Sequence, residues 1–181
     1  MNDRSAGSRL LHPAPAPSFD DPLGMLLACH GRMRRQLATL TRLSRHLGEV
    51  GLDDEAQTAA LAVARYFDRA APDHHADEDL SLMPRLVARA PDMAPLAATV
   101  HATHTDLERR WRKVRPLLSS IAVRRRQALP LRLVQDLAAA YENHLAQEEA
   151  AVLPRAHELL DAEAIAALGR EFAARRGQGV R

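Results

Sequence analysis

The chain has 181 residues and a formal net charge of +2; 46% of its residues are hydrophobic, but only 3% are aromatic. This length suits one domain with one core, and the dominance of Leu and Ala favours packed helices over a sheet. The lack of aromatics beside the arginine clusters argues against nucleic acid as a partner, and no apolar run is long enough to cross a membrane. The single cysteine, Cys29, excludes an intrachain disulfide and, with no signal-peptide pattern at the N-terminus, predicts a cytoplasmic protein.

The first long helix is expected directly after a proline-rich segment. Residues 1–18 are polar and then proline-rich without an apolar period, which predicts a flexible tail. Asp21 and Pro22 form a typical helix start, a capping acid followed by a proline in the first turn. The apolar stripe of this helix extends to Leu47, and His30 stands in its middle.

The second helix is expected to begin at Asp53, where acidic residues favour an N-terminus. Its buried stripe includes His74 and Glu78, and the helical pattern weakens before Arg89. Pro72 lies inside the pattern and removes a backbone hydrogen bond, so we expect a kink just before His74.

Two further long helices are expected in the second half of the chain. The third begins near Pro91 and has one histidine, His104, in its apolar stripe. A loop over residues 119–130 leads to the fourth helix, whose stripe contains His144 and Glu148.

A short fifth helix is expected from Asp161, a suitable N-cap, to about Arg176. The pattern therefore predicts an all-α protein, an up-down-up-down four-helix bundle with a short C-terminal fifth helix. The bundle domain is expected to span residues 19–176, between the flexible tail and a frayed C-terminus at 177–181.

One sequence frame, H-x3-E-[DE]-x4-P, occurs on both the second and the fourth helix. Residues i and i+4 share one face of a helix, so each copy presents an imidazole and a carboxylate in the same direction. The frame gives the two halves of the chain a weak internal repeat. Its members are His74, Glu78, Asp79 and Pro84 in the first copy, and His144, Glu148, Glu149 and Pro154 in the second.

Six polar residues are expected to point into the core of the bundle. A lone histidine on an apolar face is more often a hydrogen-bonded core residue than a ligand. For six converging residues that reading is poor, because it leaves buried charges and unmet hydrogen bonds. A metal centre removes this cost, and two carboxylates can bridge two ions that imidazoles cap. The candidate ligands are His30, His74, Glu78, His104, His144 and Glu148.

These residues resemble the pattern of the hemerythrin family, in its HHE cation-binding branch. The resemblance covers about residues 20–176 and includes the segments DPLGMLLACH at 21–30 and ALGREFAARR at 167–176. It implies a non-haem di-iron centre, with two iron ions bridged by carboxylate and oxo groups, in a four-helix bundle. It also implies that the six candidate residues are the iron ligands.

The chain departs from the oxygen-carrying hemerythrins at two places. Those proteins have two histidines four residues apart on the third helix, whereas His101 and His104 are three apart. They also place the last acid five residues after the histidine of the fourth helix, where Glu149 stands; helical rotation favours Glu148 instead. Four residues stay open as further or alternative ligands: His101, Glu149, His75 and Asp79.

The sequence also makes predictions for three residues in or beside the two frames. We expect His75 and Asp79 to form a pair on the solvent side, although either could replace a ligand. Tyr141 lies one turn before His144 and either packs in the core or donates a hydrogen bond to a bound oxygen species.

Three functions follow from such a centre. The protein binds O2 or a related small ligand as a carrier, sensor or scavenger, or it is an enzyme that reduces peroxide or nitric oxide, or it binds iron or another divalent metal without catalysis. The first predicts a reversible optical change with O2, the second predicts turnover, and the third predicts neither. The sequence leaves both the choice between enzyme and binding protein and the oligomeric state open.

Overall fold

The computed structural model of the protein describes residues 18–178, and every regular element within them is a helix. The expected all-α class is confirmed. Of the short elements, η1 and η3 are π-helices and η2 is a 3₁₀ helix. The elements in chain order are α1 (Pro22–Glu49), α2 (Asp54–Asp77), η1 (Glu78–Leu82), α3 (Met83–Arg89), η2 (Pro91–Met93), α4 (Ala94–Ala122), α5 (Leu131–Gln147), η3 (Glu148–Val152), α6 (Leu153–Leu159) and α7 (Ala162–Arg175).

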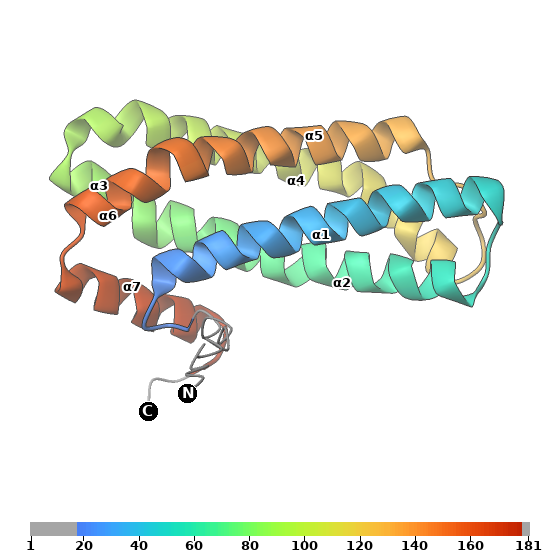
Figure 1. Cartoon of the computed structure of the whole chain (residues 1–181), viewed down its shortest axis with the longest axis horizontal. Coiled ribbons are helices and arrows are strands. Elements are labelled where there is room, and N and C mark those ends of the chain that lie inside the picture. Colours follow the sequence, from blue (N-terminus) through green and yellow to red (C-terminus); the bar gives the residue numbers. More distant parts are fainter. Residues whose placement is uncertain (1–17, 179–181) are drawn as a thin grey trace, which may run out of the picture.

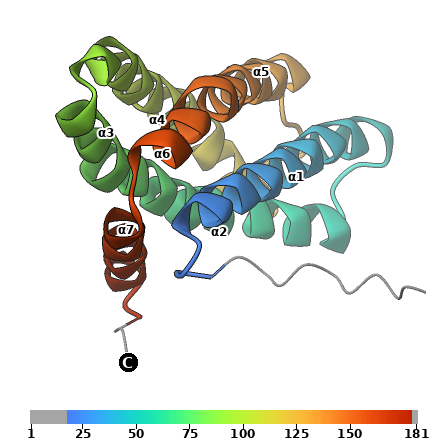
Figure 2. The same cartoon turned by 60° about the vertical axis from the view of Figure 1, so that its left-hand side comes forward.

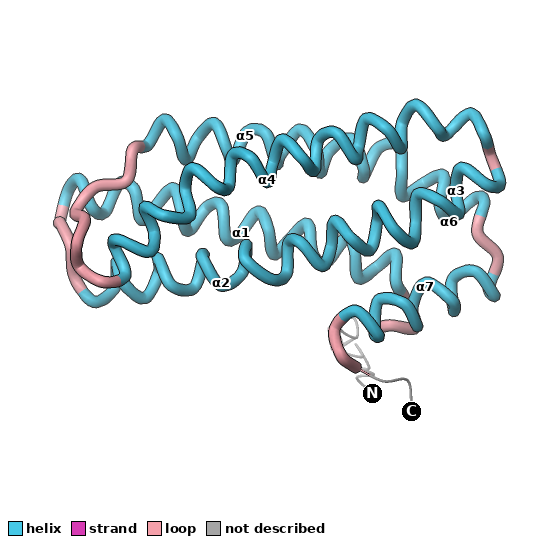
Figure 3. The backbone as a smooth tube through the Cα atoms, turned by 180° about the vertical axis from the view of Figure 1, so that it is seen from behind, coloured by secondary structure: helices cyan, strands magenta, loops and turns pink. Residues whose placement is uncertain are grey.

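Four long helices lie side by side and form a bundle (Figure 1). Helix α2 packs against α1 and α4, and α5 packs against the same two helices, so the contacts close a ring around one axis. Two of the rods are composite, because α2 continues through η1 into α3 and α5 continues through η3 into α6 (Figure 3). The up-down-up-down order of the helices stays a prediction.

Helix α7 lies outside the ring, against the end of the bundle where α1 begins (Figure 2). It contacts α1, α2 and η1. The C-terminal helix therefore covers the part of the bundle in which the first copy of the sequence frame lies.

Three of the expected helix starts are confirmed by side-chain caps. The carboxylates of Asp21, Asp53 and Asp161 accept hydrogen bonds from the backbone N–H groups three residues further on, at 2.9, 2.8 and 2.8 Å. Such a cap stabilises a helix by about 1 kcal/mol. Helix α4 runs to Ala122, so the connection to α5 is shorter than the loop expected over residues 119–130.

The interior contains two hydrophobic clusters with a polar layer between them. The larger cluster includes Met33, Phe67 and Leu107, and the smaller one includes Leu26 and Val100. On both α1 and α4 the candidate histidine stands between a residue of one cluster and a residue of the other. The bundle therefore places the polar layer inside its apolar core, away from both ends.

Within residues 18–178, no helix is long and apolar enough to cross a membrane. The cytoplasmic location and the division into tail, bundle and frayed end stay predictions. Most of the two terminal segments, 1–18 and 177–181, lies outside the described residues.

Candidate metal centre

The structure brings all six candidate residues together in the polar layer. Each of the four long helical rods contributes, and every one of the six side chains is buried, with at most 5% of the residue exposed. The six are His30 on α1, His74 on α2, Glu78 at the start of η1, His104 on α4, His144 on α5 and Glu148 at the start of η3.

Both glutamates stand where an α-helix changes into a π-helix. In η1 the N–H of Met83 bonds to the carbonyl of Glu78, five residues earlier, and in η3 the N–H of Leu153 bonds to that of Glu148. Met83 and Leu153 are each followed directly by the proline of their frame. Because proline has no N–H and its ring crowds the preceding turn, a wider turn suits this position.

The sequence analysis expected a kink just before His74, caused by Pro72, and this bend stays a prediction. Helix α2 continues as an α-helix through Pro72 to Asp77, and the change of helix type comes only at Glu78. The helix accommodates the single missing N–H at Pro72, whereas the π-turn coincides with Pro84 at the end of the frame.

The six residues form two overlapping groups of possible metal ligands. One group consists of His30, His74 and the two glutamates, and the other consists of His104, His144 and the same two glutamates. Within each group, one ligand atom from every residue lies within 4.8 Å of the others. Both carboxylates therefore belong to both groups.

The distances show that the two oxygens of each glutamate face different histidines. Glu78 places Oε1 at 3.4 Å from Nε2 of His74 and Oε2 at 3.2 Å from Nε2 of His104. Glu148 places Oε2 at 3.3 Å from Nε2 of His30 and Oε1 at 3.2 Å from Nε2 of His144. Each glutamate therefore offers one oxygen to each of the two groups.

The facing atoms have no hydrogen-bond partners within the described part of the chain. These unpaired buried atoms are Nε2 of His30, His74, His104 and His144, and both carboxylate oxygens of Glu78 and Glu148. A buried polar group without a partner costs roughly 1–3 kcal/mol, so eight such atoms in one layer require an explanation. Nitrogen and oxygen donors that converge on one region fit a bound metal, which would give these atoms a partner.

The second acid of each frame lies behind a histidine of the other half of the chain. Oε1 of Glu149 is 2.9 Å from Nδ1 of His30, and Oδ2 of Asp79 is 3.0 Å from Nδ1 of His104. In both histidines it is therefore the opposite ring nitrogen, Nε2, that faces the glutamates. A carboxylate at Nδ1 fixes the tautomer and orientation of a histidine that binds a metal through Nε2.

His101, which the sequence left open as a ligand, lies outside the centre. Its side chain is 70% exposed, and its Nδ1 is 3.0 Å from Oδ2 of Asp79. Asp79 thus stands between an exposed histidine and a buried one. The expected pairing of Asp79 with His75 was wrong, because Asp79 turns towards α4.

Burial and neighbouring charges shift the pKa values in the centre in opposite directions. Burial lowers the pKa of His74 well below its usual value and that of His144 to about 4, so both rings are neutral at neutral pH. Burial and the adjacent Glu148 carboxylate raise the pKa of Glu78 well above its usual value. Burial alone would lower the pKa of His104, but contacts with the three surrounding carboxylates raise it to about 11. The metal-free centre therefore holds protons where cations would otherwise balance the negative charge.

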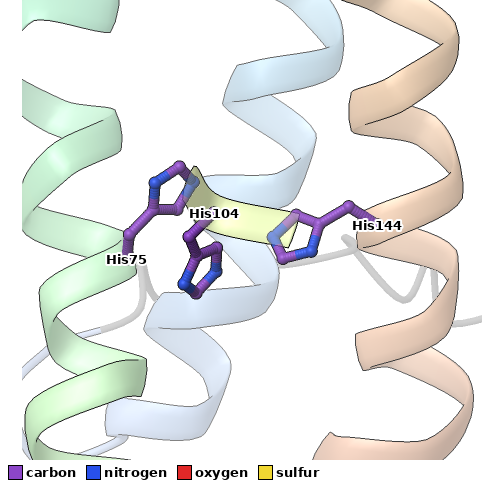
Figure 4. A group of neighbouring side chains, drawn as sticks. All are labelled: His75, His104 and His144. Carbon is purple, nitrogen blue, oxygen red and sulfur yellow. The ribbon is translucent and has the colours of Figure 1, made fainter. Parts of the chain in front are cut away.

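The structure places His75 differently from the solvent-side position expected from the sequence. Its ring is partly buried and stacks on His104, with 4.1 Å between ring centroids and 14° between ring planes. It also meets the edge of His144 at 5.8 Å, and the three rings lie together in Figure 4. The only signal in the sequence is its position next to His74, and an α-helix turns neighbouring residues about 100° apart.

Tyr141 packs in the larger hydrophobic cluster, with 2% of the residue exposed. Its ring centroid is 5.3 Å from that of Phe67 and 6.2 Å from that of His75. These contacts favour the core-packing alternative of the sequence analysis.

Comparison with known proteins agrees with this geometry. The family model described as "Hemerythrin HHE cation binding domain" matches residues 21–156, which include all six candidate ligands. A curated protein of Haemophilus influenzae, described as an uncharacterized protein, is 29% identical over 168 residues, which cover 93% of this chain and 97% of the relative. Most of the chain is therefore similar to a protein of nearly the same length.

Proposed function

The chain belongs to the hemerythrin family of HHE cation-binding domains, and on this premise we propose that it holds two non-haem iron ions and binds O2 or a related small oxidant there, as a carrier, sensor or scavenger. The observation that carries the proposal is that two buried groups of histidines share both of their carboxylates. A shared pair of carboxylates holds two cations close to each other, which a single-ion site does not need.

Each residue of the centre has a defined part in the proposal. His30 and His74 would hold one ion, His104 and His144 would hold the other, and both glutamates would contribute to each. Four protein residues for each ion would leave room for a small ligand. Bound iron would supply reversible electron transfer to O2 or a related diatomic.

The surrounding residues support the binding of a small ligand rather than of a large substrate. The polar layer lies between Leu82 and Val152 on one side and Phe67 and Tyr141 on the other, and at most 2% of each of these residues is exposed. Such walls exclude bulk water and strengthen the electrostatic interactions inside the layer. Asp79 and Glu149 hold the rings of His104 and His30 from outside the layer.

The proposal is tested by metal content together with an optical spectrum. The metal-free protein is loaded anaerobically with ferrous iron, exposed to air and then degassed. We expect two irons per chain, near-ultraviolet and visible absorption that appears with O2, and loss of this absorption on degassing.

The other outcomes separate the remaining functions. Two irons with an irreversible spectrum, and turnover of peroxide or nitric oxide, would identify an enzyme. A single ion per chain, or a preference for zinc without any spectrum, would contradict oxygen binding and leave metal binding without catalysis.

A further inference from the structure

A surface pocket borders the half of the centre to which His104 belongs. It has a volume of about 420 Å³ and lies between α2, η1 and α4. Of the six candidate ligands His104 is the most exposed, at 5%, and it lines this pocket together with His75. A small molecule in the pocket therefore comes next to one of the candidate ligands.

His75 belongs both to the wall of this pocket and to the surroundings of the buried histidines. One nitrogen each of His75, His104 and His144 lies within 4.8 Å of the others. The three side chains come from α2, α4 and α5, and the rings of His75 and His144 each turn a nitrogen towards the other (Figure 4). The pocket and the space between these rings therefore share His75 and His104 as a common boundary.

The stacking of His75 on His104 decides how His75 can act in that space. The two rings are nearly parallel, with 14° between their planes and 4.1 Å between their centroids. Nitrogen lone pairs lie in the ring planes, so those of two parallel rings do not meet at one ion. A hydrogen bond does not need such a common point, because an N–H of His75 lies in a layer beside that of His104. His75 can therefore donate to the outer atom of a small ligand whose inner atom lies in front of His104.

The buried nitrogen of His75 is free to make this hydrogen bond. Its Nε2 is enclosed and has no partner within the described residues, although most buried polar atoms in proteins are paired. Other polar side chains of the pocket wall do have partners: the hydroxyl of Thr105 donates to the carbonyl of His101 at 3.3 Å, and Glu108 lies 3.3 Å from Arg112. A neutral imidazole can carry its proton on Nε2, so His75 offers a donor to a molecule from outside.

We propose that a small ligand at the inner end of this pocket, beside His104 and His144, accepts a hydrogen bond from Nε2 of His75. The inference rests on the proposed function, because the centre binds the other end of the same ligand. The class of ligand that fits is a molecule of two or three atoms with a hydrogen-bond acceptor at its outer end, such as O2 or azide. His75 then retains the ligand without binding the metal itself.

The test measures the affinity of azide for the ferric, iron-loaded protein by the charge-transfer absorption of the complex. His75→Phe keeps an aromatic ring against His104 and removes the N–H. We expect azide to bind roughly three- to tenfold more weakly, as the loss of one hydrogen bond predicts, and to dissociate faster. His75→Gln places an amide N–H near the position of Nε2 and should restore the affinity towards the wild-type value.

Two controls separate the loss of a donor from a structural defect. His157→Phe makes the same change at an exposed histidine of α6 and should bind azide as the wild type does. Anaerobic titration with cobalt(II) should give the wild-type affinity for both ions in His75→Phe, because His75 is no metal ligand in this proposal.

The possible results are distinguishable. Unchanged azide affinity in His75→Phe would overturn the inference, and so would a His75→Gln variant that binds azide as weakly as His75→Phe. Weaker cobalt binding in His75→Phe would also overturn it, because His75 would then support the metal and not the ligand. A wild type that takes up fewer than two irons contradicts the proposed function itself, and the inference falls with it.

Discussion

Oε1 of Glu149 lies 2.9 Å from Nδ1 of His30, although the two residues are 119 positions apart in the chain. The same oxygen accepts a hydrogen bond of 2.7 Å from Nη1 of Arg34, one helical turn after His30. In the other half of the chain, Asp79 has the corresponding place behind His104, at 3.0 Å. Each half therefore places a carboxylate next to Nδ1 of the lone histidine of the other half.

Glu149→Gln should weaken metal binding without preventing it. The neutral amide oxygen accepts a weaker hydrogen bond from Nδ1–H than the carboxylate does, so the ring of His30 loses basicity and is held less firmly. Loss of such a partner typically costs about 10–100-fold in metal affinity. Anaerobic metal titration of the variant measures this loss.

The matched control for Glu149 is Glu142→Gln. Glu142 also contacts Arg34, at 3.0 Å, but its side chain is 56% exposed and it is no partner of His30. We expect Glu142→Gln to leave the affinity unchanged. An equal loss in both variants would show that Arg34, and not the orientation of His30, is responsible.

Glu78→Gln and Glu148→Gln should each affect both ions, because both carboxylates belong to both groups. Substitution of a histidine, as in His30→Ala, should mainly affect one ion. Metal analysis by atomic emission after desalting tests this pattern. Two tightly bound ions in Glu78→Gln would rule out the bridging role of that residue.

Loading the centre with metal at neutral pH should release protons. Burial and Glu148 raise the pKa of Glu78, and the surrounding carboxylates raise that of His104 to about 11, so His104 holds its proton at neutral pH in the metal-free protein. His144, with a pKa lowered to about 4, is already neutral and releases none. A group with a raised pKa must lose its proton before it binds a cation, and metal affinity therefore increases as the pH rises through neutrality.

Calorimetric titrations in two buffers with different ionisation enthalpies count the released protons. We expect at least one proton per chain. An apparent binding enthalpy that does not depend on the buffer would contradict the protonation of His104 in the metal-free protein.

Asp77→Ala should destabilise the contact between α7 and the bundle. Asp77 is fully buried next to Glu78, and its carboxylate pairs with Arg175 at the end of α7 and, at 2.6 Å, with Arg176, the next residue. The substitution leaves the two arginines without their carboxylate partner. We expect the free energy of unfolding to fall by about 3 kcal/mol. This is the lower end of the range for a broken buried ion pair, because the arginines reach solvent. Urea unfolding of the metal-free protein measures this free energy.

The control for this prediction is Glu171→Ala. Glu171 on α7 pairs with Arg85 at 2.5 Å, but it is 42% exposed, and a pair at the surface contributes at most about 1 kcal/mol. A similar loss of stability in both variants would show that α7 is held by its apolar face rather than by Asp77.

The sequence by itself determined the long helices, three of their starts and six of the polar residues that enter the core. Capping acids such as Asp53 and Asp161, and apolar stripes with a period of 3.6, depend only on neighbours along the chain. For the same reason the paired frames placed His74 with Glu78 and His144 with Glu148 on common faces before any tertiary contact was known.

Only the tertiary structure decided what the residues beside those faces do. The π-turns at Glu78 and Glu148 break the 3.6-residue period, so rotation along an ideal helix cannot give the directions of Asp79 and Glu149. Their partners, His104 and His30, lie on helices from the other half of the chain, and the packing of those helices sets the distances. The stacking of His75 on His104 likewise depends on how closely α2 and α4 approach each other, which no local pattern encodes.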